Sequence, residues 1–221
     1  MKLLFELSKE HDTLPEAEVL ALYEAYGVKF NSSKHKNLLL VEGALEPQIL
    51  QKRLAFTHSV YRVFAEGPDV KAVLNKAKID GSFAVRANGF KENQKTEREG
   101  GAFLRQETGK DIDLRNPDIC IYLFKLENVI GCDQKYEIDK KGFKERDPQN
   151  RPYFHPTALK PKLARAMVNL ARVGEGDTIL DPFCGTGSIL IEAALVGAKP
   201  VGIDLDKSKI DGCKRTSISL N

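Results

Sequence analysis

Hydrophobic positions in residues 1–66 alternate between the spacing of strands and that of helices. One helical pattern begins at Pro15 and ends at Gly27, and a second begins at Pro47, since proline suits a first helical turn. The strand patterns cover residues 2–7, 28–31, 37–42 and 58–65. This order, β-α-β-β-α-β, predicts a ferredoxin-like α+β domain.

Residues 67–145 combine further helical and strand patterns around a turn. The turn is Asn116-Pro117-Asp118, a sequence that favours chain reversal. The helical patterns cover 68–77 and 96–107, and the strand patterns cover 81–88, 119–126 and 128–136. We therefore predict a second α+β domain over this block.

Charged residues and prolines dominate residues 140–152, and we expect the linker there, over 146–160. The block 161–221 then returns to regular patterns. Its elements are a helix over 160–172, a strand at 178–180, a helix from Thr186 to Gly197, a strand at 201–204 and a helix from Lys207 to about Leu220. A β-α-β-α order predicts the start of an α/β, Rossmann-like parallel sheet.

Composition narrows the class of protein only slightly. The chain has 221 residues, is 42% hydrophobic and 29% charged, and carries a net charge of +3, which alone indicates no nucleic-acid partner. No apolar run approaches the length of a membrane span, and the N-terminus reads as a strand and not as a signal peptide. The cysteines lack disulfide or zinc-site spacing, so we expect no metal and free thiols in a cytoplasmic protein: Cys120, Cys132, Cys184 and Cys213.

A glycine turn between the predicted strand at 178–180 and the following helix carries the candidate chemistry. Gly185 and Gly187 lack a Cβ atom, so a ligand can approach the backbone, and free N–H groups at the helix start can meet its polar atoms. Asp204, expected at the end of the next strand, can accept hydrogen bonds from ribose hydroxyls. The sequence lacks both G-x-G-x-x-G and the P-loop lysine. A glycine turn in an α/β domain of another function remains the alternative.

The run Asp181-Pro182-Phe183-Cys184-Gly185-Thr186-Gly187-Ser188 resembles the first motif of amino-group methyltransferases that act on nucleic acids. The resemblance implies S-adenosylmethionine as cofactor, with Asp181 near the methionine amino group, the glycines near the ribose, and Asp204, or less clearly Asp206, binding the ribose. The segment from Tyr153 to Thr157 is similar to the one that packs over the methionine end in those enzymes. The candidate cofactor-binding residues are Asp181, Pro182, Cys184, Gly185, Thr186, Gly187, Asp204, Asp206, His155 and Thr157.

Two of these residues have other interpretations. His155 can instead orient the linker. Cys184 can be considered as a nucleophile, but we do not expect that role, because it lies inside the cofactor turn, where a small residue suffices.

Residues 81–123 resemble the core of a THUMP domain, an RNA-binding module of tRNA-modifying enzymes. The turn from Asp113 to Asp118 is the most specific part of the resemblance, which implies binding to the acceptor end of tRNA. The candidate phosphate contacts are Arg86, Lys91, Lys95 and Arg98, with Arg105 and Arg115 as weaker candidates. The alternative is a solvated face, because Glu92, Glu97 and Glu99 are interspersed among them.

Together the blocks resemble the archaeal tRNA guanine-N2 methyltransferases, related to the eukaryotic Trm-eleven subunit. The resemblance implies ferredoxin-like and THUMP domains followed by the start of a Rossmann-like methyltransferase domain, and addition of one or two methyl groups to guanosine 10 of tRNA after it leaves the D-arm stack. The family's catalytic tetrapeptide, [D/N]-P-P-[Y/F], is absent from the chain, so we name no catalytic residue.

The missing tetrapeptide has a chemical consequence. In the resembled family this tetrapeptide holds the poorly nucleophilic guanine amine in line with the methyl group. We therefore expect the chain to be an inactive part of a larger enzyme, with a C-terminal portion or partner subunit supplying the rest. The alternative is an RNA-binding subunit with a vestigial methyltransferase fold. A thiouridine synthase would need an S-G-G-x-D-S motif, which the chain lacks.

Overall fold

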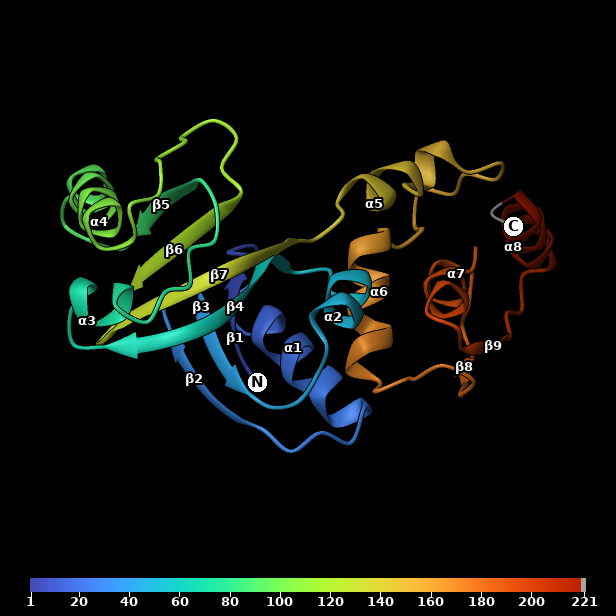
Figure 1. Ribbon diagram of the computed structural model, residues 1–221. Coiled ribbons are helices and arrows are strands. Elements are labelled where there is room, and N and C mark those ends of the chain that lie inside the picture. The colour runs from blue at the N-terminus through green and yellow to red at the C-terminus, as the bar shows by residue number, and fades with distance from the viewer. Residues whose placement is uncertain (220–221) are drawn as a thin grey trace. The chain divides into compact units, whose positions relative to one another are not determined.

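The computed structural model describes residues 1–219, which form two compact units that interleave along the sequence (Figure 1). Unit one contains residues 1–5, 31–42 and 59–136. Unit two contains residues 6–30, 43–58 and the chain from residue 137 on. No helix in the described part of the chain is both long and apolar enough to cross a membrane.

A seven-stranded mixed sheet forms the centre of unit one. Its strand order is β2-β3-β1-β4-β7-β6-β5. The hairpin β2/β3 and the pair β6/β7 are antiparallel, whereas β5 and β6 are parallel. The strands are β1 (Lys2–Leu7), β2 (Asn31–His35), β3 (Leu38–Glu42), β4 (Thr57–Gly67), β5 (Phe83–Asn88), β6 (Ile119–Lys125) and β7 (Val129–Glu137). Because the sheet runs without interruption past residue 66, the domain boundary there stays a prediction.

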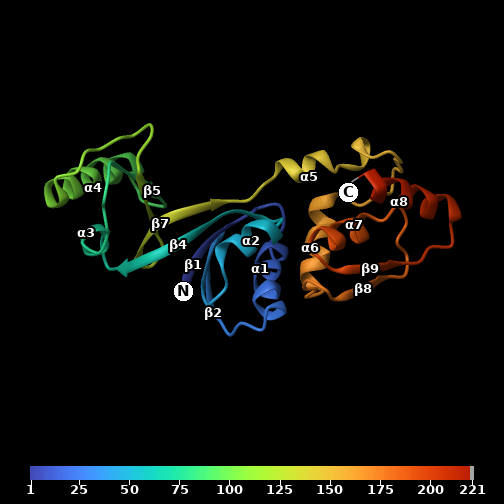
Figure 2. The same ribbon diagram turned by 45° about the vertical axis from the view of Figure 1, so that its right-hand side comes forward.

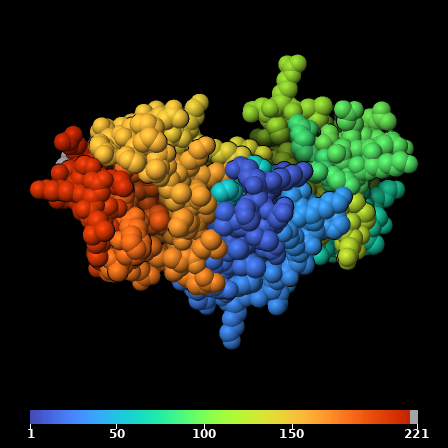
Figure 3. All heavy atoms as spheres, turned by 180° about the vertical axis from the view of Figure 1, so that it is seen from behind, coloured from blue at the N-terminus to red at the C-terminus, as the bar shows by residue number. Residues whose placement is uncertain are grey.

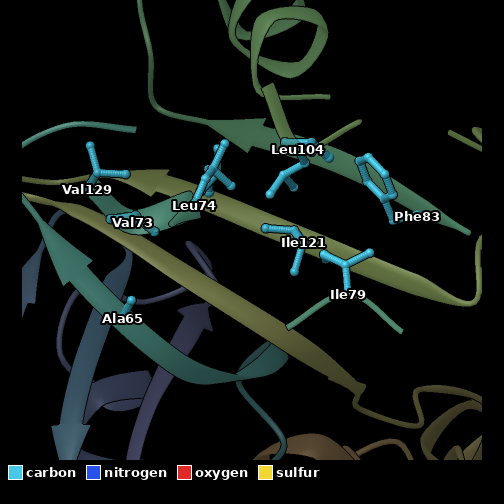
Figure 4. Packing of buried hydrophobic residues seen from close by; sticks show 10 residues of the cluster. Ala65, Val73, Leu74, Ile79, Phe83, Leu104, Ile121 and Val129 are labelled. Atoms are coloured by element: carbon cyan, nitrogen blue, oxygen red, sulfur yellow. The ribbon is translucent and has the colours of Figure 1, made fainter. Parts of the chain in front are cut away.

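Two helices, α3 (Val70–Leu74) and α4 (Asn93–Thr108), contribute to the core of unit one (Figure 4). Leu74 and Leu104 from these helices pack with Phe83 and Ile121 from the strands, and all four are fully buried. A Cβ atom on Gly100 would lie 3.3 Å from Leu74 Cδ1, so the glycine permits α4 to approach α3 closely. A second apolar cluster is built from strand residues alone: Leu4, Leu38, Leu40, Tyr61, Phe124, Ile130 and Cys132.

Unit two packs helices from both ends of the sequence together. Helix α1 (Leu14–Ala25) lies against α6 (Pro161–Leu170), and in Figure 3 the blue N-terminal segment and the orange segment that contains α6 are side by side. The parallel pair β8 (Thr178–Asp181) and β9 (Lys199–Gly202) carries α7 (Ser188–Leu195) on one side (Figure 2). The remaining elements are α2 (Pro47–Arg53), α5 (Lys141–Glu145), a 3₁₀ turn (Pro148–Asn150) and α8 (Lys207–Ser219).

The order of the predicted elements is confirmed, with three differences. The predicted strand at 28–31 is displaced to β2, because Val28 N still bonds Tyr23 O (2.9 Å) and keeps the chain at the end of α1. Two short elements were not predicted: α5, at the end of the second predicted block, and the 3₁₀ turn, inside the predicted linker. Both are too short to show an apolar period. The predicted strand at 201–204 begins and ends earlier, as β9, and Leu220, predicted near the end of the last helix, lies outside the described residues.

Candidate cofactor site

The glycine turn connects the end of β8 to the start of α7. Gly187 N donates to Cys184 O (2.7 Å), which closes the turn, and both Gly185 and Gly187 have left-handed backbone angles, with φ of 52° and 79°. L-residues with side chains rarely adopt such angles, so glycine is needed at both positions.

The two glycines face different surroundings. A Cβ atom on Gly185 would meet nothing within 4 Å, so the backbone there is open to a ligand. A Cβ atom on Gly187 would lie 2.2 Å from Cys213 Sγ in α8. The absence of a side chain at Gly187 therefore serves internal packing, and the idea that this glycine admits a ligand gains no support from the geometry.

Asp204 reaches back to the glycine turn. Its Oδ2 accepts a hydrogen bond from Gly185 N (2.8 Å), and its Oδ1 accepts one from Asp206 N (2.8 Å). These bonds, that from Asp206 first, lower the pKa of Asp204 below its usual value and keep the carboxylate ionised. The expectation that Asp204 ends a strand is wrong, because the pairing of β8 with β9 stops at Asp181↔Gly202. After Gly202 the chain contacts the glycine turn, where Cys184 N donates to Ile203 O (2.9 Å).

A cavity of about 480 Å³ lies beside this turn, within the range of small-molecule sites. Six predicted cofactor residues line it: Thr157, Asp181, Cys184, Gly185, Thr186 and Asp204. The other lining residues were not predicted from the sequence: Ala158, Leu159, Phe183, Ser188, Ile189, Leu205 and Lys209. Phe183 and Ser188 stand inside the quoted motif and could have been named from it. Nothing in the sequence singles out Leu205 or Lys209.

Four predicted residues do not line the cavity: Pro182, Gly187, Asp206 and His155. Asp206 Oδ1 accepts hydrogen bonds from Ser208 N (2.9 Å) and Ser208 Oγ (2.6 Å) at the start of α8, and these bonds lower its pKa. His155 Nδ1 lies 2.8 Å from Thr157 Oγ1, which favours the role of orienting the chain. Asp206 thus precedes the first turn of α8, and His155 contacts Thr157, which does line the cavity.

Cys184 has the environment of a packed thiol. It is buried, and a Cβ atom on Gly202 would lie 2.9 Å from its Sγ. Burial, with further effects from Cys213 and two aspartates, raises the pKa of the thiol. Because the thiolate is the nucleophilic form, this environment disfavours covalent chemistry.

The candidate RNA contacts lie in unit one and divide into two groups. Arg86 is half-buried, and its Nη2 donates to Leu114 O (2.8 Å), so it holds the loop before Asp118 in place. The others are exposed: Lys91, Lys95, Arg98, Arg105 and Arg115. Lys95 and Arg98 line a polar groove at the start of α4 together with Glu92, to which Lys95 pairs at 3.9 Å.

Known proteins resemble this chain in sequence and in fold. Residues 148–217 match the family of RMKL-like methyltransferase domains. The chain is 35% identical to a tRNA (guanine(10)-N2)-dimethyltransferase of Methanothermobacter thermautotrophicus, over 97% of this chain and 67% of that protein. It is 34% identical to the protein of the same name from Methanocaldococcus jannaschii, over 91% and 66%. The chain thus spans about two thirds of the length of these relatives.

Solved structures share the fold. The crystal structure of TrmN from Thermus thermophilus superposes with a TM-score of 0.54 at 20% identity and covers 100% of this chain and 70% of its own. A 4-thiouridine synthetase in complex with RNA and ATP gives a TM-score of 0.50 at 14% identity, over 95% and 63%. At these identities the likeness establishes a THUMP-type fold with a mixed sheet. It carries no conclusion about shared chemistry.

Proposed function

Because this chain belongs to the archaeal family of tRNA (guanine(10)-N2)-methyltransferases, we propose that it forms the N-terminal part of an enzyme that methylates N2 of guanosine 10 in tRNA with S-adenosylmethionine. The observation that carries the proposal is the Gly185–Asp204 hydrogen bond, which sets an ionised carboxylate beside an open glycine at the edge of the cavity. The expected product is N2-dimethylguanosine, because the names of the two relatives specify a dimethyltransferase.

Membership of the same family supports a proposed division of the chain into domains. Residues 1–66 would form a ferredoxin-like domain and residues 67–145 a THUMP domain, joined by the linker 146–160 to the start of a Rossmann-like domain over 161–221. The strand order β2-β3-β1-β4, with two intervening helices, supports the first assignment. The exposed cations at the start of α4 support contact with tRNA phosphates in the second.

The residues around the cavity suit the cofactor. Asp204 would accept hydrogen bonds from the ribose hydroxyls, and Asp181 would accept one from the methionine ammonium group. The exposed side chains of Phe183 and Leu205 offer apolar surface to an uncharged aromatic base. When bound, the cofactor supplies an electrophilic methyl group on a sulfonium, and the residues of this chain bind and orient it.

Activation of guanine requires groups that this sequence does not contain. The amine lone pair of guanine is delocalised into the ring, so hydrogen-bond acceptors must hold the nitrogen in line with the methyl group. The family tetrapeptide that supplies them does not occur among the 221 residues. We therefore propose that this chain alone does not catalyse turnover.

Methyl transfer to defined tRNA transcripts tests the proposal. The protein from the complete coding sequence is assayed with a transcript that carries guanosine at position 10 and with one that carries inosine there, which lacks the N2 amine. We expect methylation of the first transcript only, and none of either by the 221-residue chain. Equal labelling of both would refute N2 of guanosine 10 as the target, whereas tRNA binding without any methylation would favour an RNA-binding subunit.

The cofactor half of the proposal has its own matched pair of variants. Asp204→Asn keeps an acceptor for Gly185 N but removes the charge, and should weaken binding of S-adenosylhomocysteine about tenfold, the usual effect of one charged hydrogen bond. Asp211→Asn, at an exposed position of α8, should leave the affinity unchanged. Equal affinities for the two variants would contradict the role of Asp204.

A further inference from the structure

Ser188 stands at the point where the cofactor cavity meets the start of α7. It is the first residue of that helix, lines the cavity, and is 5% exposed. Arg151, from the segment before α6, lies behind it and is 8% exposed. Arg151 Nη1 donates to Ser188 Oγ at 2.8 Å, and Arg151 Nε donates to Arg146 O at 3.0 Å.

This contact leaves the Ser188 hydroxyl with an uncommitted proton. A hydroxyl has one hydrogen to donate and two lone pairs to accept with, and the guanidinium of Arg151 occupies one lone pair. In the part of the chain that the structure describes, Ser188 Oγ has no acceptor for its own hydrogen. A hydroxyl that accepts from a cation is also a better donor, because hydrogen bonds in a chain polarise one another.

The charge of Arg151 is buried without a direct ion pair to any described residue. Its neighbours Arg146 and Arg165 bind the buried carboxylate of Glu192, at 2.8 and 2.7 Å. Arg151 Nη2 has no hydrogen-bond partner among the described residues. Arg151 therefore adds a positive potential to that of the free N–H groups at the start of α7, and both favour an anion in the cavity.

The segment that bears Arg151 is anchored a second time. A Cβ atom on Gly212 of α8 would lie 2.2 Å from Tyr153 Cδ1, so the tyrosine ring lies directly on the helix backbone there. Between these anchors and α6, Thr157, Ala158 and Leu159 form one wall of the cavity. The position of Ser188 relative to this wall is thus fixed by contacts on both α7 and α8.

We propose that the Ser188 hydroxyl donates to the carboxylate at the amino-acid end of the cofactor, with Arg151 as the positioning residue that holds and polarises it. The inference rests on the proposed cofactor site. S-adenosylmethionine has one anionic group, which Asp181 and Asp204 repel, so it belongs at the donors near Ser188. The competing cation is Lys209, which lines the same cavity but pairs with Asp206 at 3.8 Å.

Two ligands separate this role from a purely structural one. S-adenosylhomocysteine carries the carboxylate, whereas 5′-methylthioadenosine has the same nucleoside without the amino-acid portion. Their affinities for the chain are measured by ligand-observed NMR, which reaches millimolar affinities. Ser188→Ala should weaken S-adenosylhomocysteine about tenfold, as expected for a hydrogen bond to a charged group, and leave 5′-methylthioadenosine within about twofold. Ser188→Thr, which keeps the hydroxyl, should retain the preference of the wild type for S-adenosylhomocysteine over 5′-methylthioadenosine.

Variants of the two cations complete the test. Arg151→Gln should reduce the preference for S-adenosylhomocysteine by several-fold, and by more than Lys209→Met, the variant of the competing cation. An equal loss for both ligands in Ser188→Ala, or no loss, overturns the proposal, as does loss of the preference in Lys209→Met alone. If the wild-type chain binds neither ligand, the proposed cofactor site itself fails, which is distinguishable from these outcomes. Ser188→Ala removes only a hydroxyl, so it keeps the proposal falsifiable if Arg151→Gln does not fold.

Discussion

Asn169 donates a hydrogen bond to Glu18 across 151 residues of sequence, from Nδ2 to Oε1 at 2.8 Å, in the interior of unit two. The carboxylate of Glu18 also accepts from the backbone N–H groups of Ala55 and Phe56, at 2.9 and 2.8 Å. Asn169 Oδ1 accepts in turn from Arg53 Nε at 3.0 Å. Helix α6, which follows the wall of the cofactor cavity, is thus bonded to the helices of the N-terminal block, and the two parts form one structural unit.

Truncation of Glu18 should destabilise this unit strongly. Glu18→Ala leaves two backbone N–H groups and one hydrogen of the Asn169 amide buried without an acceptor, while the other amide hydrogen keeps its bond to Arg53 O; each unsatisfied donor costs about 1–3 kcal/mol. We expect the free energy of unfolding to fall by about 3 kcal/mol or more in urea titrations. Glu46→Ala, at an exposed helix start without a side-chain cap, should change it by less than about 0.5 kcal/mol. Similar losses for both variants would contradict the importance of the network.

The same carboxyl should make stability depend on pH in an unusual direction. Burial is the largest effect on Glu18 and raises its pKa above the ordinary value of 4.5, so the folded state holds the proton more tightly than the unfolded state. The resulting contribution to stability is complete below about pH 4.5 and is lost as the pH rises through the raised pKa.

Comparison of wild type with Glu18→Gln isolates this contribution, because the glutamine cannot titrate. Urea midpoints are measured from pH 4.5 upward. We expect the stability of the wild type relative to the variant to decrease as the pH rises and then to level off above the raised pKa. A relative stability that increases over this range would show that the hydrogen bonds outweigh burial and lower the pKa.

The two glycines of the cofactor turn should respond differently to alanine. In Gly187→Ala the new Cβ atom meets Cys213 Sγ at 2.2 Å and the backbone keeps a φ of 79°, so steric overlap adds to conformational strain. Gly185→Ala suffers the strain but has open space. We expect losses of about 3 kcal/mol and about 1–2 kcal/mol in the free energy of unfolding, respectively.

A double variant separates overlap from strain at Gly187. Cys213→Ala removes the sulfur that the new Cβ atom would meet, so Gly187→Ala should cost less in that background than in the wild type. Equal costs in the two backgrounds, measured by urea titration, would show that backbone strain accounts for the whole effect. Gly185→Ala should still lose affinity for S-adenosylhomocysteine, because Gly185 lines the cavity proposed to hold the cofactor.

What the sequence predicts well are features set by a local pattern. The glycine turn between a strand and a helix is recognisable because its residues are contiguous, and Asp204 is a candidate because it follows Gly185 by 19 residues. The hydrogen bond from Gly185 N to Asp204 was not predicted. The Gly187–Cys213 and Glu18–Asn169 contacts depend on how helices pack, which no local period reports. For the same reason the sequence does not predict the two compact units, because each is built from segments that are separated along the chain, whereas the predicted domains are contiguous.

The exposed cations of unit one should contribute to tRNA affinity through charge alone, whereas Arg86 should act through structure. Lys95→Glu and Arg98→Glu place a negative charge where a phosphate would lie, so each should weaken binding severalfold at low salt and reduce the salt dependence by about one counterion. Lys199→Glu, a charge reversal at an exposed position in unit two, controls for net charge.

Arg86→Met removes the bond to Leu114 O, so its effect should persist at high salt, where the phosphate contacts are screened. Filter binding of tRNA at several salt concentrations measures all four variants. If Lys199→Glu weakens binding as much as Arg98→Glu, the effect is one of net charge and the surface at the start of α4 is not the contact site.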